Sequence, residues 1–229
     1  HTIETLTKGV DDFSEDRVIK GMVGRELTNR YPVREGVEIG DVIFEVDDWN
    51  AFHPDDAERQ MLKDINIKVC AGEVVGLAGL MGAGRTEFAM SLFGKSYGQK
   101  ISGKIKINGQ EVTIKSPTEA QKLKIGYVPE DRLTEGLCLA QPIADNITLA
   151  SLKRLSNAIG LLKHQDIVED ANIWKEKFSI ATDDVRKLAS TLSGGNQQKI
   201  VLSKWLSNSL DVLVLNGPRS EERRVGKEC

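Results

Sequence analysis

The segment Gly79-Leu80-Met81-Gly82-Ala83-Gly84-Arg85-Thr86 has the residue types and spacing of a phosphate-binding loop. Glycines let the backbone curl so that successive N–H groups point at phosphate oxygens, and a following helix presents its positive end to the same anion. Arg85 stands where lysine is usual. Its forked guanidinium keeps the positive charge but does not reproduce the point contact that a lysine ammonium makes with a phosphate. The alternative is a plain strand-to-helix turn. The residues expected to bind phosphate are Gly79, Gly82, Ala83, Gly84, Arg85 and Thr86, with the Thr86 hydroxyl at the Mg²⁺ position.

A strand before this loop and a helix after it must position these residues. Residues 73–78 form an apolar run typical of a strand buried on both faces. The helix is expected to run to Gly94, with four apolar residues at helical spacing: Phe88, Ala89, Leu92 and Phe93. The loop therefore has the strand–loop–helix context that a phosphate site requires.

The other elements are consistent with an α/β chain that carries a helical insertion. The Asn108-Gly109 turn predicts a hairpin, and Ser116-Pro117-Thr118-Glu119 predicts a capped helix start. Further strands are expected at 42–46, 65–69, 125–128 and 211–215. Residues 143–178 have helical character, with one expected core face: Ile167, Ala171, Trp174 and Phe178.

A second motif, Thr191-Leu-Ser-Gly-Gly-Asn-Gln-Gln-Lys199, opens a helix whose apolar face holds Val201, Leu202 and Trp205. The Ser-Gly-Gly start of this helix offers unpaired backbone N–H groups and a hydroxyl to an anion. The alternative is a capped helix that contains Leu-Ser-Gly-Gly by coincidence. A third motif, Tyr127-Val-Pro-Glu-Asp-Arg132, follows an expected strand; taken alone, it could equally be a solvated turn centred on proline.

Together the three motifs resemble those of ABC-type ATPases. The Asn-Gln-Gln-Lys ending at 196–199 and Gly-Ala-Gly-Arg-Thr at 82–86 are similar to the second nucleotide domain of ribose, xylose and multiple-sugar importers. The resemblance implies a P-loop NTPase fold of the α/β class, in which an ABC ATPase core carries an antiparallel β subdomain and a helical subdomain at about 141–190. It also implies that this fold is incomplete at the C-terminus.

Roles for individual residues follow from the resemblance. The ligands it implies are ATP and Mg²⁺, the latter held through ATP by Thr86. Glu130 stands where other ABC ATPases place the Q-loop glutamine, so its side chain would contact Mg²⁺ or the attacking water. Four residues would clamp the γ-phosphate of an ATP held by the opposite domain: Ser193, Gly194, Gly195 and Asn196.

The implied function is ATP binding and hydrolysis that drive monosaccharide import through a membrane permease. The implied partners are a first nucleotide-binding domain, on the same or a second chain, the permease, and indirectly a periplasmic or extracellular sugar-binding protein. The implied location is the cytoplasmic face of the membrane, as a peripheral subunit. Which sugar is carried does not follow from these motifs. The alternatives are a non-transport ABC ATPase and a non-hydrolysing regulatory module.

Two positions depart from the family pattern at the end of the apolar run at 212–215. Asn216 replaces an aspartate that orients Mg²⁺ through water, and Gly217 replaces the carboxylate that activates the attacking water. A neutral amide holds a cation more weakly, and glycine cannot accept a proton. This domain's own site is therefore expected to bind nucleotide and hydrolyse it poorly, while Ser193, Gly194 and Gly195 still complete the partner's site.

The composition bears on the classes of partner and of structure that the chain can have. The 229 residues include 31 basic and 34 acidic side chains, a balance that argues against a nucleic-acid partner bound through bulk charge. No apolar run reaches the ~18–20 residues of a membrane span. The cysteines Cys70, Cys138 and Cys229 lack C-x-x-C spacing and are expected to be free thiols.

The expected domains are 1–40, the end of a preceding nucleotide domain and its linker, and 41–218, a partial ABC domain. Within the first of these, 15–25 could form a short helix, and 28–40 is expected to be a linker. The string at 219–229 resembles a translated sequencing adapter; a solvated charged tail is the alternative. An adenine-stacking aromatic is expected upstream of the glycine loop, and Trp49, Phe52 and His53 are equal candidates.

Overall fold

The computed structural model describes residues 5, 7, 17, 36–80, 82–94 and 97–217. Residues 1–38 and 39–229 form two separate units, and the elements below all belong to the second. Apart from Arg17, the expected helix at 15–25 lies outside the described residues, as do most of the linker at 28–40 and the tail at 219–229.

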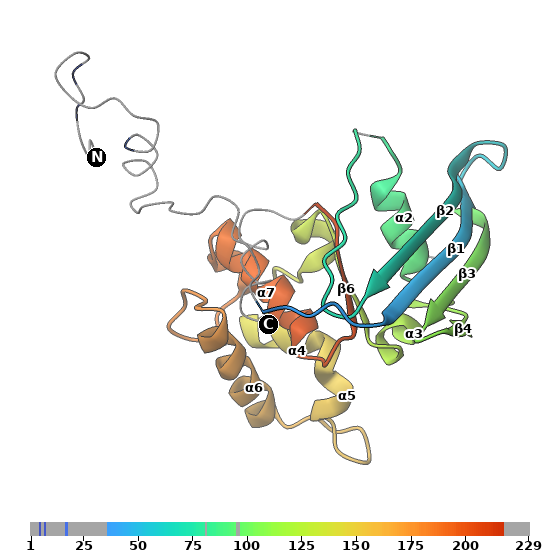
Figure 1. Cartoon of the computed structure of the whole chain (residues 1–229). Helices are drawn as coiled ribbons and strands as arrows, with labels where there is room; N and C mark the ends of the chain where they lie inside the picture. The colour runs from blue at the N-terminus through green and yellow to red at the C-terminus, as the bar shows by residue number, and fades with distance from the viewer. Residues whose placement is uncertain are drawn as a thin grey trace. The chain divides into compact units, whose positions relative to one another are not determined.

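Four antiparallel strands form the first sheet, in the order β2-β1-β3-β4 (Figure 1). Val46 of β1 is paired with Ile67 on one side and Ile105 on the other, at the centre of the sheet. The Asn108-Gly109 turn joins β3 to β4 as predicted. The strands are β1 (Val42–Phe52), β2 (Gln60–Cys70), β3 (Gln99–Ile107) and β4 (Gln110–Val112).

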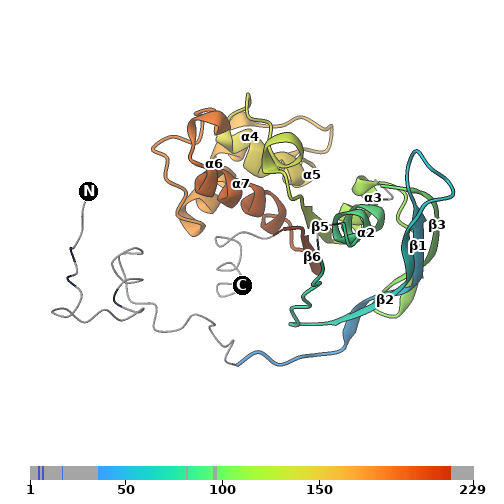
Figure 2. The same cartoon turned by 90° about the horizontal axis from the view of Figure 1, so that it is seen from above.

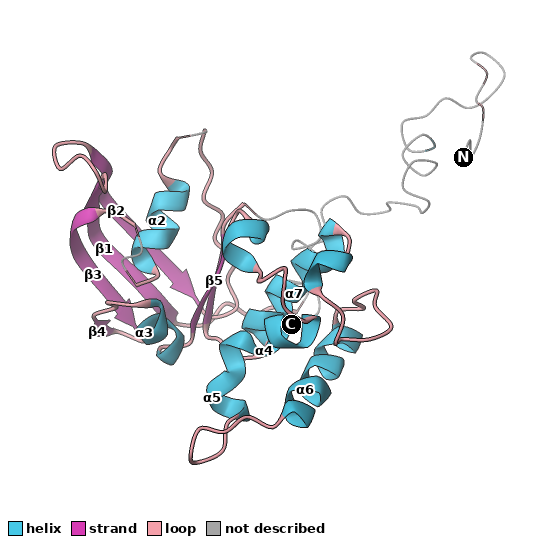
Figure 3. Cartoon of the chain, turned by 180° about the vertical axis from the view of Figure 1, so that it is seen from behind, coloured by secondary structure: helices cyan, strands magenta, loops and turns pink. Residues whose placement is uncertain are grey.

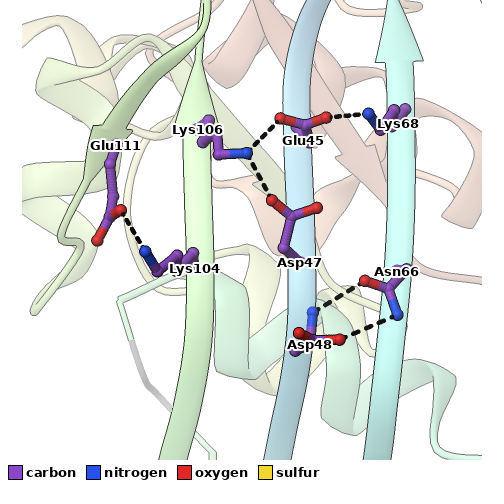
Figure 4. A network of polar contacts seen from close by, with 8 residues as sticks. All are labelled: Glu45, Asp47, Asp48, Asn66, Lys68, Lys104, Lys106 and Glu111. Carbon is purple, nitrogen blue, oxygen red and sulfur yellow. Dashed lines mark hydrogen bonds and ion pairs between the residues drawn. The ribbon is translucent and has the colours of Figure 1, made fainter.

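The outward face of this sheet carries a ladder of opposite charges across neighbouring strands (Figure 4). Lys106 Nζ on β3 lies 2.9 Å from Glu45 Oε1 and 2.6 Å from Asp47 Oδ2 on β1, and Glu45 also pairs with Lys68 on β2. Hydrogen bonds to Asp47 and Glu45 hold the pKa of Lys106 above its usual range. One more ion pair, Lys104 with Glu111, extends the ladder, and the Asp48 backbone N–H donates to Asn66 Oδ1 at 3.0 Å beside it. Such cross-strand pairs fix the register and leave the opposite face for the core.

That opposite face packs against two helices, which in turn cover a pair of parallel strands (Figure 2). The Trp49 indole Nε1 on β1 donates to Ser91 Oγ on α2 at 2.9 Å, inside the core. As predicted, α2 ends before Gly94 and α3 begins after Ser116, whose hydroxyl accepts from the Glu119 N–H at 3.3 Å. The elements are α2 (Arg85–Leu92), α3 (Pro117–Lys122), β5 (Ile125–Val128) and β6 (Val212–Leu215), with β5 and β6 parallel.

The helical part lies beyond the parallel strands and has a hydrophobic core of its own (Figure 3). The expected apolar face is confirmed: Ile167 and Ala171 are buried, and Trp174 stacks on Phe178 with ring centroids 5.9 Å apart. Trp205 packs against both cores and so links the two parts. The elements are η1 (Arg132–Gly136), α4 (Ile143–Thr148), η2 (Leu149–Ser151), α5 (Leu152–Leu155), α6 (His164–Lys177), η3 (Ala189–Thr191) and α7 (Gly194–Leu206).

The expected strand at 73–78 is wrong. The segment has no regular structure, and its apolar side chains are exposed: Val74 is 74% exposed and Leu77 is 48% exposed. A strand buried on both faces needs neighbours that satisfy its N–H and C=O groups. Among residues 36–217, apart from the gaps, β5 and β6 pair only with each other and leave this segment without a partner strand. An apolar run indicates that its side chains favour a buried environment, but it does not indicate whether a neighbouring strand is present.

The Asn146 side chain holds together the turn that leads into α4. Its Oδ1 accepts from the Cys138 N–H at 2.8 Å, and its Nδ2 donates to the Cys138 and Pro142 carbonyls at 3.0 Å each. The residue is 2% exposed, so water cannot replace these bonds. We expect Asn146→Asp to lower the free energy of unfolding by about 2 kcal/mol, because a carboxylate would face two buried carbonyls with no proton to donate.

Asn157→Asp is the matched control for that measurement. The Asn157 side chain is exposed, and its Oδ1 accepts from the Ile159 and Leu161 N–H groups, a role that a carboxylate also performs. Its free energy of unfolding should stay within about 0.5 kcal/mol of the unaltered chain, measured by chemical denaturation. Equal losses in the two variants would contradict the account of Asn146.

Candidate functional site

The glycine loop enters α2 through a left-handed turn. Gly82 and Gly84 have φ angles of +80° and +81°, a backbone region that side chains disfavour, and Gly84 is the N-cap of the helix. Arg85 and Thr86 therefore lie in the first turn of α2, where backbone N–H groups lack partners within the helix. Gly79 and Ala83 belong to the same loop, and a Cβ on Gly79 would lie 2.9 Å from the Ala83 Cβ. The Ala83 N–H donates to the Leu80 carbonyl at 3.1 Å within the loop, and phosphate binding by the loop stays a prediction.

The Thr86 hydroxyl is the centre of a small polar cluster. Thr86 Oγ1 donates to Glu130 Oε2 at 3.3 Å, and the Asn216 amide lies beside it, with Oδ1 at 3.5 Å and Nδ2 at 3.2 Å. The three residues come from α2, from the segment after β5 and from the end of β6. The carboxyl ends of two parallel strands and the start of a helix therefore meet at one point.

Tyr127 is hydrogen-bonded to this cluster, and the sequence did not predict this contact. Its hydroxyl accepts from Asn216 Nδ2 at 3.2 Å, and the side chain is 8% exposed. Burial raises the pKa of Tyr127, while the hydrogen bond from Asn216 opposes the shift. The sequence offered one signal for Tyr127: it lies in an expected strand, two residues before Pro129. Asn216 is thus held by a neutral hydroxyl and is itself 8% exposed.

The second motif forms the start of α7, as predicted. Ser193 is the N-cap residue, and Gly194 and Gly195 open the first turn. Ser193 Oγ makes no capping bond to the backbone and accepts instead from Asn196 Nδ2 at 3.0 Å. Asn196 Oδ1 accepts in turn from the Ala181 N–H at 2.9 Å. The Ser193 hydroxyl is thus held by the Asn196 side chain and does not cap the backbone of the helix.

Arg132 is a second residue that sequence reasoning missed. It follows Glu130 by two positions and lies at the start of η1, yet its Nε donates to Gln197 Oε1 on α7 at 3.4 Å. A Cβ on Gly194 would lie 2.8 Å from the Arg132 Nη2, so the guanidinium covers the first turn of α7. The segment after β5 therefore contacts both the Thr86 cluster and the second motif. The run Glu-Asp-Arg was the available signal, but only the fold pairs it with α7.

The predicted residues fall into two groups. Of the glycine-loop residues, Thr86 lies with Glu130 and Asn216 at the carboxyl ends of β5 and β6. Ser193, Gly194, Gly195 and Asn196 lie at the start of α7. For the adenine-stacking position, Trp49 is excluded by its burial and its bond to Ser91. Phe52 and His53 are half-buried and stay candidates.

Comparison with known proteins decides the family. A family model described as "ABC transporter" matches residues 62–220, more than half of the chain. The chain belongs to the ABC transporter family. Its expected fold, an α/β P-loop ATPase core with an antiparallel sheet and a helical part, is confirmed.

The relatives of this ABC transporter chain include three import proteins. It is 50% identical over 217 residues to the L-arabinose transport ATP-binding protein AraG of Geobacillus stearothermophilus, covering 95% of this chain and 42% of that protein. It is 38% identical to the xylose import ATP-binding protein XylG of Thermoanaerobacter pseudethanolicus, covering 93% and 42%. It is 39% identical to the ribose import ATP-binding protein RbsA of Lactococcus lactis, covering 93% and 41%. The chain thus spans about two fifths of the length of the curated relatives it matches.

Solved structures agree on the fold of this ABC transporter chain. A nucleotide-free ATP-binding cassette from an ABC transporter superposes with a TM-score of 0.63 at 15% identity, covering 79% of this chain and 71% of that one. CbiO1 of Clostridium perfringens superposes with a TM-score of 0.57 at 21% identity, covering 76% and 65%. No helix in the described part of the chain is long and apolar enough to cross a bilayer.

The donor atoms around Thr86 fit a magnesium ion. A carboxylate oxygen and an amide oxygen each lie within 3.5 Å of the Thr86 hydroxyl. Mg²⁺ prefers oxygen ligands, of which the protein supplies one or two while phosphates and water supply the rest. Groups of three or more His, Cys, Asp or Glu side chains that could hold a metal alone are not found in the part that the structure describes.

Proposed function

We propose that this chain is part of an ATPase that drives monosaccharide import through a membrane permease, and that it forms the second of two nucleotide-binding regions. The observation that carries the proposal is the similarity, at 38–50% identity, to the arabinose, xylose and ribose import proteins. The polar cluster at Thr86 and the open start of α7 support the same function. Both are anion-facing helix starts, and each comes from a different motif.

Each group of residues has a proposed role. Backbone N–H groups at 82–86 and the Arg85 guanidinium would bind the phosphates of ATP. Thr86 would hold Mg²⁺, with Glu130 and Asn216 beside it; when bound, this ion neutralises charge on the outer phosphates. Ser193, Gly194, Gly195 and Asn196 would bind the γ-phosphate of a nucleotide held by the first nucleotide-binding domain. The site of each nucleotide is then shared between two domains.

The partners follow from that arrangement. A first nucleotide-binding domain, on the same or a second chain, would supply the opposite face, and permease subunits would take up the movement when the two domains close. A sugar-binding protein outside the membrane would take part indirectly. We place the chain at the cytoplasmic face of the membrane as a peripheral subunit.

The experiment is to measure ATP turnover by the full transporter in proteoliposomes, with and without the sugar-loaded binding protein. The proposal expects ATP to bind to residues 79–86 and turnover to rise with arabinose, xylose or ribose. Binding is checked by displacement of a fluorescent ATP analogue, with AMP as the control because it lacks the outer phosphates. Absence of ATP binding, or turnover that no sugar changes, would reject the proposal.

A second candidate, a nucleotide-binding module without hydrolysis of its own, is favoured by Asn216 and Gly217. Neither side chain can accept a proton from water. In that case the ATP held at Thr86 would persist while the partner's nucleotide turns over. Single-turnover hydrolysis with radiolabelled ATP tests this candidate, because a silent second site leaves half of the bound nucleotide intact.

A further inference from the structure

The loop between α5 and α6 has an apolar tip that no described element covers. Residues 157–162 project from the helical part (Figure 3), and three of their side chains are exposed: Ile159 by 78%, Leu161 by 60% and Leu162 by 42%. Single exposed aliphatic side chains are normal on a protein surface, whereas neighbouring ones on one short loop indicate a contact surface. The free energy that these side chains gain by leaving water is therefore available to a partner.

The backbone of this tip satisfies its hydrogen bonds within the loop. Asn157 Oδ1 accepts from the Ile159 N–H at 3.1 Å and from the Leu161 N–H at 2.9 Å. The Gly160 N–H donates to the Asn157 carbonyl, and the Asn157 N–H donates to the Leu161 carbonyl, at 2.9 Å each. Gly160 allows the turn to close with a φ angle of +80°. Such a tip can enter an apolar medium at low cost, because unpaired N–H groups are what that medium penalises.

Basic residues flank the apolar tip on both sides. The segment 152–165 contains Lys153, Arg154 and Lys163 and no acidic residue, although the whole chain has a net charge of −3. Arg154 is paired with Asp170 of α6 at 2.8 Å. The two lysines are exposed, and no ion pair joins either of them to an acidic group that the structure describes. Two unpaired ammonium groups therefore flank the tip in the chain, one on each side.

We propose that the loop at 157–162 inserts its apolar tip into the surface of an anionic lipid bilayer, with Lys153 and Lys163 against the headgroups. Apolar side chains beside lysines are typical of segments that lie in a membrane interface. Lipid headgroups supply the negative charge that the two ammonium groups lack, and the acyl chains receive Ile159 and Leu161. The contact goes beyond the proposed function, because it needs neither ATP nor a permease, and its failure would leave that function untouched.

The net charge of −3 makes a preference for anionic lipid informative, because the chain as a whole is repelled by an anionic surface. Salt limits the reach of each exposed charge to about 8–10 Å. Attraction must therefore come from cations next to the surface, each of which strengthens binding about fivefold. With two such lysines, we expect the chain to bind vesicles of equal parts phosphatidylglycerol and phosphatidylcholine about 25-fold more tightly than vesicles of phosphatidylcholine alone.

Co-sedimentation with these two kinds of vesicle, for the unaltered chain and two double variants, tests the contact. In Lys153→Gln with Lys163→Gln, the preference for phosphatidylglycerol should fall about 25-fold, while binding to phosphatidylcholine alone stays unchanged. In Ile159→Ser with Leu161→Ser, binding to both kinds of vesicle should weaken about tenfold, while the preference is kept. The charged and the apolar parts of the contact are thereby measured separately.

Matched controls remove the same kinds of group elsewhere in the chain. Lys63→Gln with Lys122→Gln takes two exposed lysines from β2 and α3, and Ile173→Ser takes an isoleucine that is 63% exposed on α6. Both controls should bind vesicles as the unaltered chain does. Equal losses in the controls and in the loop variants would overturn the proposal, and so would an unaltered chain with no preference for phosphatidylglycerol.

Two other occupants of the loop would give different results. If the loop contacts a second copy of the chain, size-exclusion chromatography shows a dimer that the double variant of Ile159 and Leu161 separates, and vesicle binding does not change. If it contacts a permease, the chain binds proteoliposomes that contain the permease and does not bind bare vesicles. Either result rejects the lipid contact.

Discussion

A transporter that carries Ser193→Arg is expected to lose sugar-stimulated ATP turnover, by about 100-fold or more. Ser193 is the N-cap of α7, and its hydroxyl is oriented by Asn196 toward the open first turn. An arginine there would fill the space in front of the Gly194 and Gly195 N–H groups, where the proposed γ-phosphate binds. The Arg132 guanidinium already lies against Gly194 in this turn. The measurement is phosphate release by the reconstituted transporter with saturating sugar-binding protein.

Ser190→Arg is the control for the size and charge of the introduced arginine side chain. Ser190 is exposed three residues before Ser193, and its backbone N–H donates to the Leu139 carbonyl at 3.2 Å, a bond that the substitution keeps. Turnover in this variant should match the unaltered transporter. If Ser193→Arg retains turnover, or if both variants lose it to the same degree, the start of α7 is not the phosphate contact that we propose.

Local signals in the sequence predicted most of the elements correctly. The Asn108-Gly109 turn, the Ser116 cap and the apolar spacing of α6 each depend on residues near one another in the chain, and all three are confirmed. The strand expected at 73–78 failed for the opposite reason. A buried parallel strand depends on neighbours far away in the sequence, and an apolar run contains no information about whether they are beside it.

The same difference between local and long-range signals applies to the candidate site. Glycines and a threonine at fixed spacing predicted the loop, because a phosphate-binding loop contacts phosphate through consecutive backbone N–H groups. The bonds of Tyr127 to Asn216 and of Arg132 to Gln197 join residues 89 and 65 positions apart. The packing of Glu130 against Gly217 is of the same kind, and only the parallel pairing of β5 with β6 brings the two together. Residue types alone do not show that the Glu130 side chain lies over Gly217.

Thr86→Val is expected to lower the affinity for Mg²⁺·ATP by about 100-fold and to leave the affinity for metal-free ATP unchanged. Valine has nearly the same shape as threonine and removes only the hydroxyl, the group that contacts both Glu130 and Asn216. The backbone N–H groups of the loop remain, so the phosphates keep their contacts. Dissociation constants in Mg²⁺ and in EDTA check this directly.

Thr86→Ser separates the hydroxyl from the packing of the side chain, because serine keeps the oxygen and loses the methyl group. Its Mg²⁺ effect should stay close to that of the unaltered chain; equal losses in the serine and valine variants would assign the effect to packing. The variant Thr86→Val with Glu130→Gln then tests whether these two contacting side chains act together. Since both side chains act on one cation, the double variant should bind Mg²⁺·ATP no more weakly than Thr86→Val alone. Additive losses would mean that Glu130 and Thr86 act on separate parts of the nucleotide.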